Sequence, residues 1–504
     1  MATIRHHITV VNPKQQQLAR LKSLSGPVSG WRHQGIRHGL IVLTEQPKMG
    51  QDVPGLEVML AIMKRRGEAL DSLQHTPVIG SLPEDLLLSW IWLNPARSCF
   101  EQQSALCKAL KPLLEERPEA LALVLTGQQA NRADVAGQAL HVVWLNGVAL
   151  PTWKKIVKPG LQTLFLQGAA LGDTRFEAAR AVAEANTLAR TLTLLPPNEL
   201  TPGRYRQQIR ALARSRNWRL AEYSIARLKS MGANAFVAVA QGSAPADGAI
   251  VHLQYRGPGA RKQVALVGKG ICFDTGGHNL KPAKYMYGMH EDMNGSAVAL
   301  GILSAISRLR LPLVVDCWVA LAQNHISPRA YKQNDVVTAL NGTTIEIVHT
   351  DAEGRMVLAD TLTLAARRHP DLMLDFATLT GSMHTALGSR FSGIFASDAR
   401  LAQLAVAVGD AVGERVVVFP SATDYDVSLD SKVADIKQCT MDGAADHILA
   451  ARFLSRFTAD RPWVHMDLSA SRHEGGLGAV GSDITGFGVN WGVHFLDSWL
   501  VNKL

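Results

Sequence analysis

The chain has 504 residues, of which 47% are hydrophobic and 19% are charged. This length exceeds one ordinary core and predicts about two to four domains' worth of material, and the composition excludes a largely disordered chain. The longest apolar runs fall short of the roughly 20 residues that a membrane span requires, so no membrane segment is expected. The net charge of +9 is modest for this length.

Cysteine usage and the N-terminus indicate a reduced, intracellular protein. The five cysteines are odd in number and form no Cys-x-x-Cys motif, which is typical of free cytosolic thiols rather than of a disulfide framework. The first residues lack a sustained apolar segment followed by a small-residue cleavage site, so no secretory signal is expected. The sequence therefore predicts a cytoplasmic protein.

Two short basic clusters, at 64–66 and 154–158, lie in the first third of the chain. They could touch an anionic partner such as nucleic acid. Short basic runs are common on solvated helices, however, and no nucleic-acid-binding motif accompanies them. Solvated surface is therefore the favoured interpretation, and nucleic-acid binding is the alternative.

In chain order, residues 1–173 mix strand-like and helical patterns and predict a small N-terminal α/β domain. A helix is expected over 56–73, and strands are expected over 39–46, 120–127 and 139–147. The next segment, 174–195, is rich in Ala, Leu, Arg and Glu at helical spacing and ends at two prolines, which cannot continue a helix. It predicts a linker helix.

From 196 to 504, helical and β-rich runs alternate, as expected for a wound α/β sheet. Helices are expected over 296–309 and 355–368, and strands are expected over 263–270, 311–321, 341–350 and 372–381. These runs predict a larger α/β catalytic domain, with a mixed central sheet flanked by helices.

Two short blocks within this region, 265–295 and 349–355, hold five potential metal ligands: Lys269, Asp274, Asp292, Asp351 and Glu353. Four carboxylates and one amine suit Mg²⁺, Mn²⁺ or Zn²⁺. Both blocks follow predicted strands, where open α/β sheets bind their ligands. Two cations sharing these carboxylates would form a hydrolytic centre. Nearby glycines are expected to let the backbone approach a bound ion closely, namely Gly268, Gly270, Gly276 and Gly277.

Each of these residues also has an ordinary structural interpretation. A lysine is more often a salt-bridge partner, because it coordinates a metal only as the neutral amine. Asp351 and Glu353 precede a helix and could cap it, with Arg355 neutralising them. Their joint occurrence favours a cation, because clustered like charges are costly without one. Serine-hydrolase and thermolysin-like alternatives lack support, since neither G-x-S-x-G nor H-E-x-x-H occurs.

The motifs VGKGICFDTGG, EDMNG, HTDAEGR and ATLTG, in this order, resemble the leucyl (cytosol) aminopeptidase family over about residues 190–490. The resemblance implies a metal-dependent aminopeptidase that hydrolyses the N-terminal residue from peptides, assembled as a homohexamer. It also implies two divalent metal ions per subunit, Mn²⁺ or Zn²⁺, with Mg²⁺ or Co²⁺ as alternatives. Asp274 and Glu353 would bridge the two ions. Lys269 and Asp292 would complete one position, and Asp351 the other.

The resemblance assigns the remaining site residues as well. Lys281 would stabilise the oxyanion, and Arg355 would hold a bicarbonate ion that acts as general base. The substrate site would be lined by Met289, Thr378, Leu379 and Gly381. A DNA-binding role on the same fold and a catalytically inactive homologue are the alternatives, and the intact ligand set argues against the second.

Three positions depart from the family pattern: His349 replaces an asparagine, Thr275 a serine and Asn294 a glycine. Of these, His349 could change hydrogen bonding around the metals. Residues 467–473 look more like the peptidase B branch, which is associated with acidic as well as apolar N-terminal residues. Arg472 either points to solvent, pairs with Glu474, or reaches the pocket and favours a carboxylate there.

Overall fold

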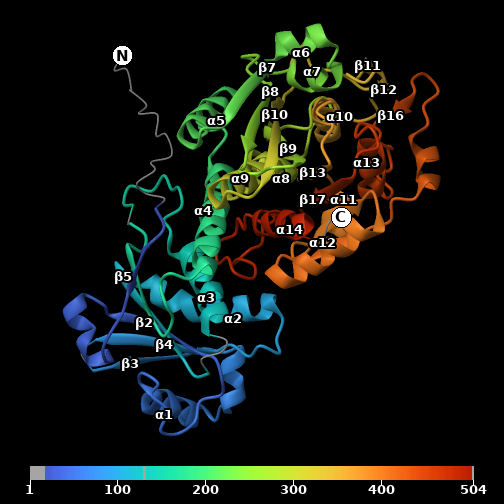
Figure 1. The fold of residues 1–504 in the computed structure, drawn as a ribbon. Coiled ribbons are helices and arrows are strands. Elements are labelled where there is room, and N and C mark those ends of the chain that lie inside the picture. Colours follow the sequence, from blue (N-terminus) through green and yellow to red (C-terminus); the bar gives the residue numbers. More distant parts are fainter. Residues whose placement is uncertain (1–16, 84, 129–131, 158, 502–504) are drawn as a thin grey trace, which may run out of the picture. The chain divides into compact units, whose positions relative to one another are not determined.

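The computed structural model describes residues 17–83, 85–128, 132–157 and 159–501 (Figure 1). The chain divides into two compact units. One comprises the residues through Thr187 together with Gly475–Ser482, and the other comprises Leu188–Glu474 and Asp483–Leu504. This division falls inside a helix, α4 (Thr174–Leu194), so the domain boundaries expected at 173 and 195 stay a prediction. Across the described ranges, no helix combines the length and the apolar character that a membrane crossing needs.

In the described part of the first unit, six strands form one sheet in the order β1-β6-β5-β2-β4-β3, parallel except for the pair of β3 with β4. The strands are β1 (Arg20–Ser23), β2 (His38–Leu43), β3 (Val78–Leu82), β4 (Leu86–Trp92), β5 (Ala120–Thr126) and β6 (Thr163–Gln167). The helices are α1 (Leu56–Arg66), α2 (Cys99–Glu115) and α3 (Arg132–Gly147), with short 3-10 turns at Val28–Gly30, Arg32–Gln34 and Leu70–Gln74. This is the small α/β arrangement that the sequence predicts.

The strand expected over 139–147 is wrong, because these residues form the second half of α3. The run is apolar and contains Val142, Val143 and Trp144, which favour strands. All three are buried in the helix. A helix that is buried nearly all round and a buried strand give the same short apolar run, so periodicity cannot separate them.

The basic cluster at 64–66 occupies the last turn of α1, which ends at Gly67 in a left-handed conformation. Cations are favoured at this end of a helix by its dipole. The cluster therefore has a structural explanation that requires no anionic partner. The second cluster is described except for Lys158, which lies outside the described residues.

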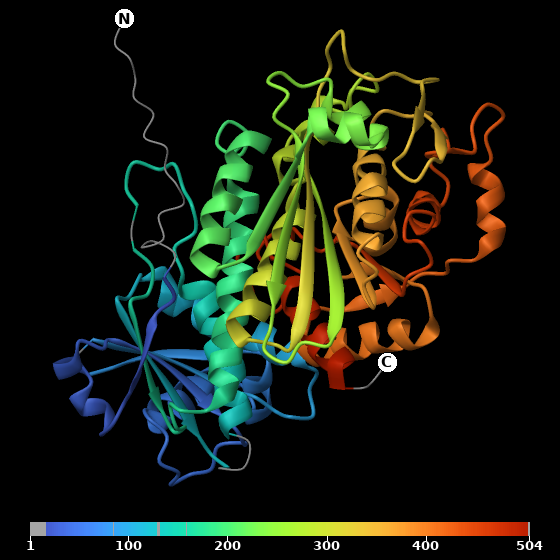
Figure 2. The same ribbon diagram turned by 45° about the horizontal axis from the view of Figure 1, so that its top comes forward.

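Within the described residues of the second unit, eight strands form a mixed sheet in the order β15-β14-β17-β13-β9-β10-β8-β7, and Figure 2 shows helices packed on both of its sides. The strands are β7 (Arg219–Ser224), β8 (Ala249–Arg256), β9 (Lys262–Asp274), β10 (Leu313–Asn324), β13 (Leu372–Ala377), β14 (Ser392–Ala396), β15 (Val416–Val418) and β17 (Trp463–Asp467). A separate three-stranded sheet joins β11 (Val336–Thr338), β12 (Thr344–Glu346) and β16 (Ile436–Lys437). The predicted mixed sheet with flanking helices is confirmed.

The helices of this unit follow the predicted alternation. They are α5 (Pro202–Arg216), α6 (Ile225–Met231), α7 (Asn234–Ala240), α8 (Ala283–Met286), α9 (Asn294–Leu309), α10 (Glu353–Ala366), α11 (Gly381–Leu387), α12 (Ala399–Val412), α13 (Asp446–Ser455) and α14 (Val489–Val501). Short 3-10 turns lie at Met289–Glu291 and Thr423–Leu429. Both α9 and α10 pack on β9, the strand at the centre of the sheet.

The central strand β9 runs parallel to both of its neighbours, β13 and β10. The carboxyl ends of these three strands therefore meet at one edge of the sheet. Gly268 in β9 and Gly295 in α9 permit the close packing there. A Cβ on Gly268 would lie 2.5 Å from Cα of Ser296, and one on Gly295 would lie 2.1 Å from the carbonyl oxygen of Phe376. Gly268 thus serves helix packing rather than the approach of an ion.

A partly buried carboxylate elsewhere in this unit, that of Glu414, is expected to make folding stability depend on pH. One oxygen of Glu414 accepts hydrogen bonds from the backbone amides of Gly488 (3.0 Å) and Trp491 (2.8 Å). Burial raises the pKa of Glu414 to about 7, against an ordinary value of 4.5. The folded state thus holds the proton more tightly than the unfolded state. Stability from this group is complete below pH 4.5 and is lost as the pH rises through about 7.

We expect Glu414→Gln to remove this pH dependence, because the amide oxygen can accept both hydrogen bonds and carries no charge. Relative to wild type, the variant should gain about 2–3 kcal/mol in unfolding free energy between pH 5 and pH 8. Urea unfolding at the two pH values measures the difference. Parallel pH profiles for the two proteins would show that Glu414 does not titrate in this range.

Candidate metal centre and active site

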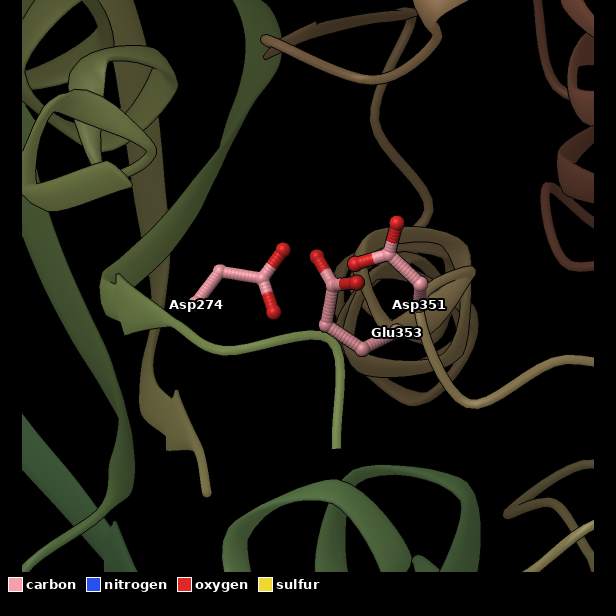
Figure 3. A group of neighbouring side chains, drawn as sticks. All are labelled: Asp274, Asp351 and Glu353. Atoms are coloured by element: carbon pink, nitrogen blue, oxygen red, sulfur yellow. The ribbon is translucent and has the colours of Figure 1, made fainter. Parts of the chain in front are cut away.

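Three of the five predicted ligands converge at the carboxyl edge of the sheet. Asp274 is the last residue of β9, Glu353 is the first residue of α10, and Asp351 lies two residues before it. One carboxylate oxygen from each lies within 4.8 Å of the other two. Figure 3 shows Asp274 pointing from its strand toward Asp351 and Glu353, which stand at the start of a helix seen end-on.

The other two predicted ligands, Lys269 and Asp292, lie on the buried side of this group. The Lys269 amine is 2.8 Å from Asp292 Oδ1 and 2.9 Å from Glu353 Oε1, and it donates to the Thr378 carbonyl oxygen at 3.0 Å. Burial alone lowers the pKa of Lys269, but Asp292, Glu353 and Asp274 together raise it above its ordinary value. All five predicted ligands therefore belong to one cluster.

Lys281 reaches the same carboxylates from the cavity side. Its amine is 2.9 Å from Asp274 Oδ2 and 2.5 Å from Asp351 Oδ1, and its side chain keeps 15% of its surface exposed. Lys269 keeps only 4%. The two lysines thus differ in access: one is enclosed among the carboxylates, and the other faces solvent.

The donor set fits divalent cations. Burial and the neighbouring carboxylates raise the pKa of Asp292 to about 7 and that of Asp351 to about 8, and they raise the pKa of Glu353 as well. The buried atoms Asp292 Oδ2 and Glu353 Oε2 find no hydrogen-bond partner among the described residues. Buried acceptors normally have partners. Oxygen atoms that repel each other and lack donors are ligands suited to a hard cation.

Hydrogen bonds from residues that are not among the five predicted metal ligands hold the cluster in place. Asn324, the last residue of β10, donates to Asp274 Oδ1 at 2.9 Å, and the Thr378 hydroxyl donates to Asp292 Oδ1 at 2.7 Å. Asp467, at the end of β17, accepts from the Leu379 amide (3.0 Å) and the Thr380 hydroxyl (2.7 Å). These contacts orient the proposed ligands and the segment 378–380, as hydrogen-bonding groups around metal sites commonly do.

Two glycines allow the turn after Asp274, and one allows the close approach of Lys269. Gly276 and Gly277 have φ of +85° and +65°, values that other residues rarely adopt. A Cβ on Gly354 would lie 2.6 Å from Lys269 Cε. Gly270 instead packs against β10, where a Cβ would meet Leu321 and the Ala320 carbonyl oxygen. The turn glycines, Gly276 and Gly277, are therefore the ones placed to let the backbone approach a bound ion, whereas Gly268 and Gly270 within β9 serve packing.

A cavity of about 1010 Å³ opens onto the cluster. Its walls include all five predicted ligands, both predicted catalytic residues, Lys281 and Arg355, and the four residues expected at the substrate site, Met289, Thr378, Leu379 and Gly381. His349, Asp446 and Arg472 also line it. The sequence-predicted residues are thus gathered in one place, although their chemical roles stay predictions.

The three departures from the family pattern make local contacts. His349 Nδ1 accepts from the Asp351 amide at 3.3 Å, so this residue helps to position a ligand. Burial lowers the pKa of His349. The Thr275 hydroxyl donates to the Asn324 carbonyl oxygen at 2.7 Å, and Asn294 donates to the Thr193 hydroxyl at 3.0 Å.

Arg472 lines the cavity but does not present a free charge to it. Its guanidinium pairs with Glu291 and lies 3.6 Å from Asp483 Oδ2, while 53% of its side chain stays exposed. Among the ion pairs of the described residues, the expected pairing with Glu474 does not occur. Selection of acidic N-terminal residues by Arg472 would require it to leave Glu291.

A largely buried, carboxylate-rich cluster at the carboxyl edge of a mixed α/β sheet, on the wall of a cavity, is the arrangement expected of proteins that bind divalent cations. Residues 187–492 match the catalytic domain of the cytosol aminopeptidase family. This match covers more than half of the chain, and the chain therefore belongs to the cytosol aminopeptidase family, as its motifs predict.

Known relatives agree with this assignment. A probable cytosol aminopeptidase of Roseiflexus castenholzii is 42% identical over 306 residues, covering 59% of this chain and 62% of the relative. One of Stutzerimonas stutzeri is 42% identical over 311 residues, covering 61% and 62%. The matched region thus spans less than two thirds of these curated relatives. The solved structure of the bottromycin maturation enzyme BotP in complex with Mn aligns with a TM-score of 0.80 at 31% identity, covering 92% of this chain and 99% of BotP.

Proposed function

We propose that this chain is a metal-dependent aminopeptidase that hydrolyses the N-terminal residue of peptides. The observation that carries the proposal is the convergence of Asp274, Asp351 and Glu353 within 4.8 Å of one another, on the wall of a cavity large enough for a peptide end. Such a group of carboxylates is costly without a cation. Membership of the cytosol aminopeptidase family and the likeness to manganese-bound BotP support the proposal.

The proposed cofactors are two divalent ions per subunit, Mn²⁺ or Zn²⁺, with Mg²⁺ or Co²⁺ as alternatives. Asp274 and Glu353 would be shared by both ions, Lys269 and Asp292 would serve one, and Asp351 the other. When bound, such ions lower the pKa of water and polarise a carbonyl group. Lys269 would bind as the neutral amine, which requires a dication to displace its proton.

The chain's own residues would position and stabilise the reacting peptide. Lys281 pairs with Asp274 and Asp351, so cations bound by these carboxylates would free its ammonium for the developing oxyanion. A fixed positive charge beside developing negative charge is usually the largest catalytic term. The walls for the first side chain would be formed by Met289, Thr378, Leu379 and Gly381.

A general base is also needed, and the family resemblance assigns this role to a bicarbonate ion held by Arg355. A guanidinium can bind a planar anion through two hydrogen bonds. In this chain Asp446 would compete with bicarbonate for this site, because Arg355 already pairs with the Asp446 carboxylate.

We also propose that the protein is a homohexamer located in the cytoplasm, and the family resemblance is the support for both.

We expect a chelator to abolish hydrolysis of aminoacyl-coumarin substrates and added Mn²⁺ or Co²⁺ to restore it, because every proposed catalytic group acts around the cations. A panel of first residues with protein loaded with Mn²⁺, Zn²⁺, Co²⁺ or Mg²⁺ measures metal and side-chain preference together. Elemental analysis of the chelated sample provides the control. Full turnover by verified metal-free protein would exclude the proposed function.

A further inference from the structure

The Arg355 guanidinium is paired with a carboxylate of the same chain, that of Asp446. This arginine lies in the first turn of α10, two residues after Glu353, and its side chain is 2% exposed. Its Nη2 donates to both carboxylate oxygens of Asp446 at 2.8 Å, and its Nη1 donates to the Gln438 carbonyl oxygen at 2.8 Å. Its buried Nε has no hydrogen-bond partner among the described residues. An anion from solution that binds the guanidinium through two hydrogen bonds would still have to compete with Asp446 for Nη2.

Asp446 is held firmly on this guanidinium. It is the first residue of α13, where the helix dipole favours a negative charge. The next residue, His447, is anchored to the Ser382 hydroxyl through its amide (2.9 Å) and lies 3.0 Å from the same oxygen through Nδ1. The His447 ring also packs edge-on against Phe419, with centroids 4.8 Å apart. The carboxylate therefore needs little further ordering to stay on Arg355.

Asp446 nevertheless remains accessible from the reaction cavity. Its side chain keeps 22% of its surface exposed and lines the same cavity as Lys281 and Glu353. A second anion on Arg355 would place two negative charges on one guanidinium, beside carboxylates that already repel each other. An ion from solution must also lose its translational freedom, which a residue of the chain has already lost. Both effects favour Asp446 over bicarbonate as the anion bound to the Arg355 guanidinium.

We propose that Asp446 is the anion of the Arg355 site and the general base of the reaction, so that the chain works without bicarbonate. This proposal rests on the proposed aminopeptidase function and replaces its external base by a residue of the chain. The Asp446 carboxylate accepts one proton from the water whose oxygen bonds to the peptide carbonyl carbon. It returns that proton to the amine nitrogen as the C–N bond breaks, and one water is consumed for each acid and amine released.

The test measures anion binding and turnover on the full chain loaded with Zn²⁺. Binding of ¹³C-labelled bicarbonate is followed by NMR in wild type, Asp446→Ala and Asp446→Asn. The control is Asp424→Asn, which removes an exposed acidic side chain outside the cavity. We expect saturable binding in Asp446→Ala and in Asp446→Asn, because both variants lose the charge that competes for the guanidinium, and none in wild type or Asp424→Asn. The isosteric Asp446→Asn tests the loss of charge if the alanine variant folds poorly.

Turnover is compared in carbon-dioxide-depleted and bicarbonate-containing buffer. Wild type should be equally active in both. Asp446→Ala should lose about 10²-fold in kcat, the scale of a lost general base, with unchanged metal content and partial rescue by bicarbonate or formate. Saturable bicarbonate binding by wild type, or full kcat in Asp446→Ala without bicarbonate, would overturn the proposal. If wild type lacks peptidase activity with every metal, the proposed function fails, while the binding measurement still decides which anion Arg355 holds.

Discussion

Replacing Glu353 by alanine is expected to remove both metal ions and to abolish peptidase activity. Glu353 is 1% exposed, and its Oε2 lacks a hydrogen-bond partner within the described ranges. As a proposed bridging ligand it serves both positions, as does Asp274. Asp351 is proposed to serve one ion, and its side chain is 27% exposed. Asp351→Ala should therefore keep one ion per chain, whereas Glu353→Ala and Asp274→Ala should keep none.

Metal content per chain, measured by elemental analysis after dialysis, is the direct readout. Glu414→Gln is the matched control, because it removes a carboxylate that lies outside the cluster and should keep wild-type metal content. Circular dichroism confirms that each variant is folded. Equal metal content in Glu353→Ala, Asp274→Ala and Asp351→Ala would contradict the assignment of bridging and single-ion ligands.

The alternating pattern of the second unit was predictable because each element is long and strongly patterned. The run 263–270 marks the buried strand β9, although the strand continues to Asp274. The turn glycines after it and the helix start at Glu353 then place carboxylates at the strand edge. Local pattern and topology therefore suffice to bring Asp274, Asp351 and Glu353 to the same region.

The contacts that complete the site were not predictable in the same way. Asp446 reaches Arg355 across 91 residues of sequence, and Asn324 reaches Asp274 across 50. Neither residue stands in a motif, and acidic residues and asparagines near helix starts and strand ends usually cap or face solvent. Such pairs depend on how distant elements pack, which a single sequence does not record. For the same reason, the pairing of Arg472 with Glu291, which lies 181 residues away in the sequence, was not predicted.

The two lysines of the cluster should separate metal binding from catalysis. Lys281→Ala is expected to lower kcat by about 10²- to 10³-fold, the scale of losing one oxyanion stabiliser, with unchanged metal content. Lys269→Ala should instead lose metal at one position. Its amine contacts Asp292 and Glu353 and is enclosed, so its loss also leaves two buried carboxylates without their cation.

Steady-state kinetics and elemental analysis on the same preparations distinguish the two effects. Excess Mn²⁺ in the assay should restore part of the activity of Lys269→Ala by mass action but none of that of Lys281→Ala, because the second variant already holds its ions. The two variants are expected to respond differently because the lysines are placed differently. Lys281 keeps 15% of its side chain exposed to the cavity, whereas Lys269 keeps only 4% and is enclosed among the carboxylates. If both variants lost metal equally, Lys281 would be a structural partner of the carboxylates rather than the group that stabilises the oxyanion.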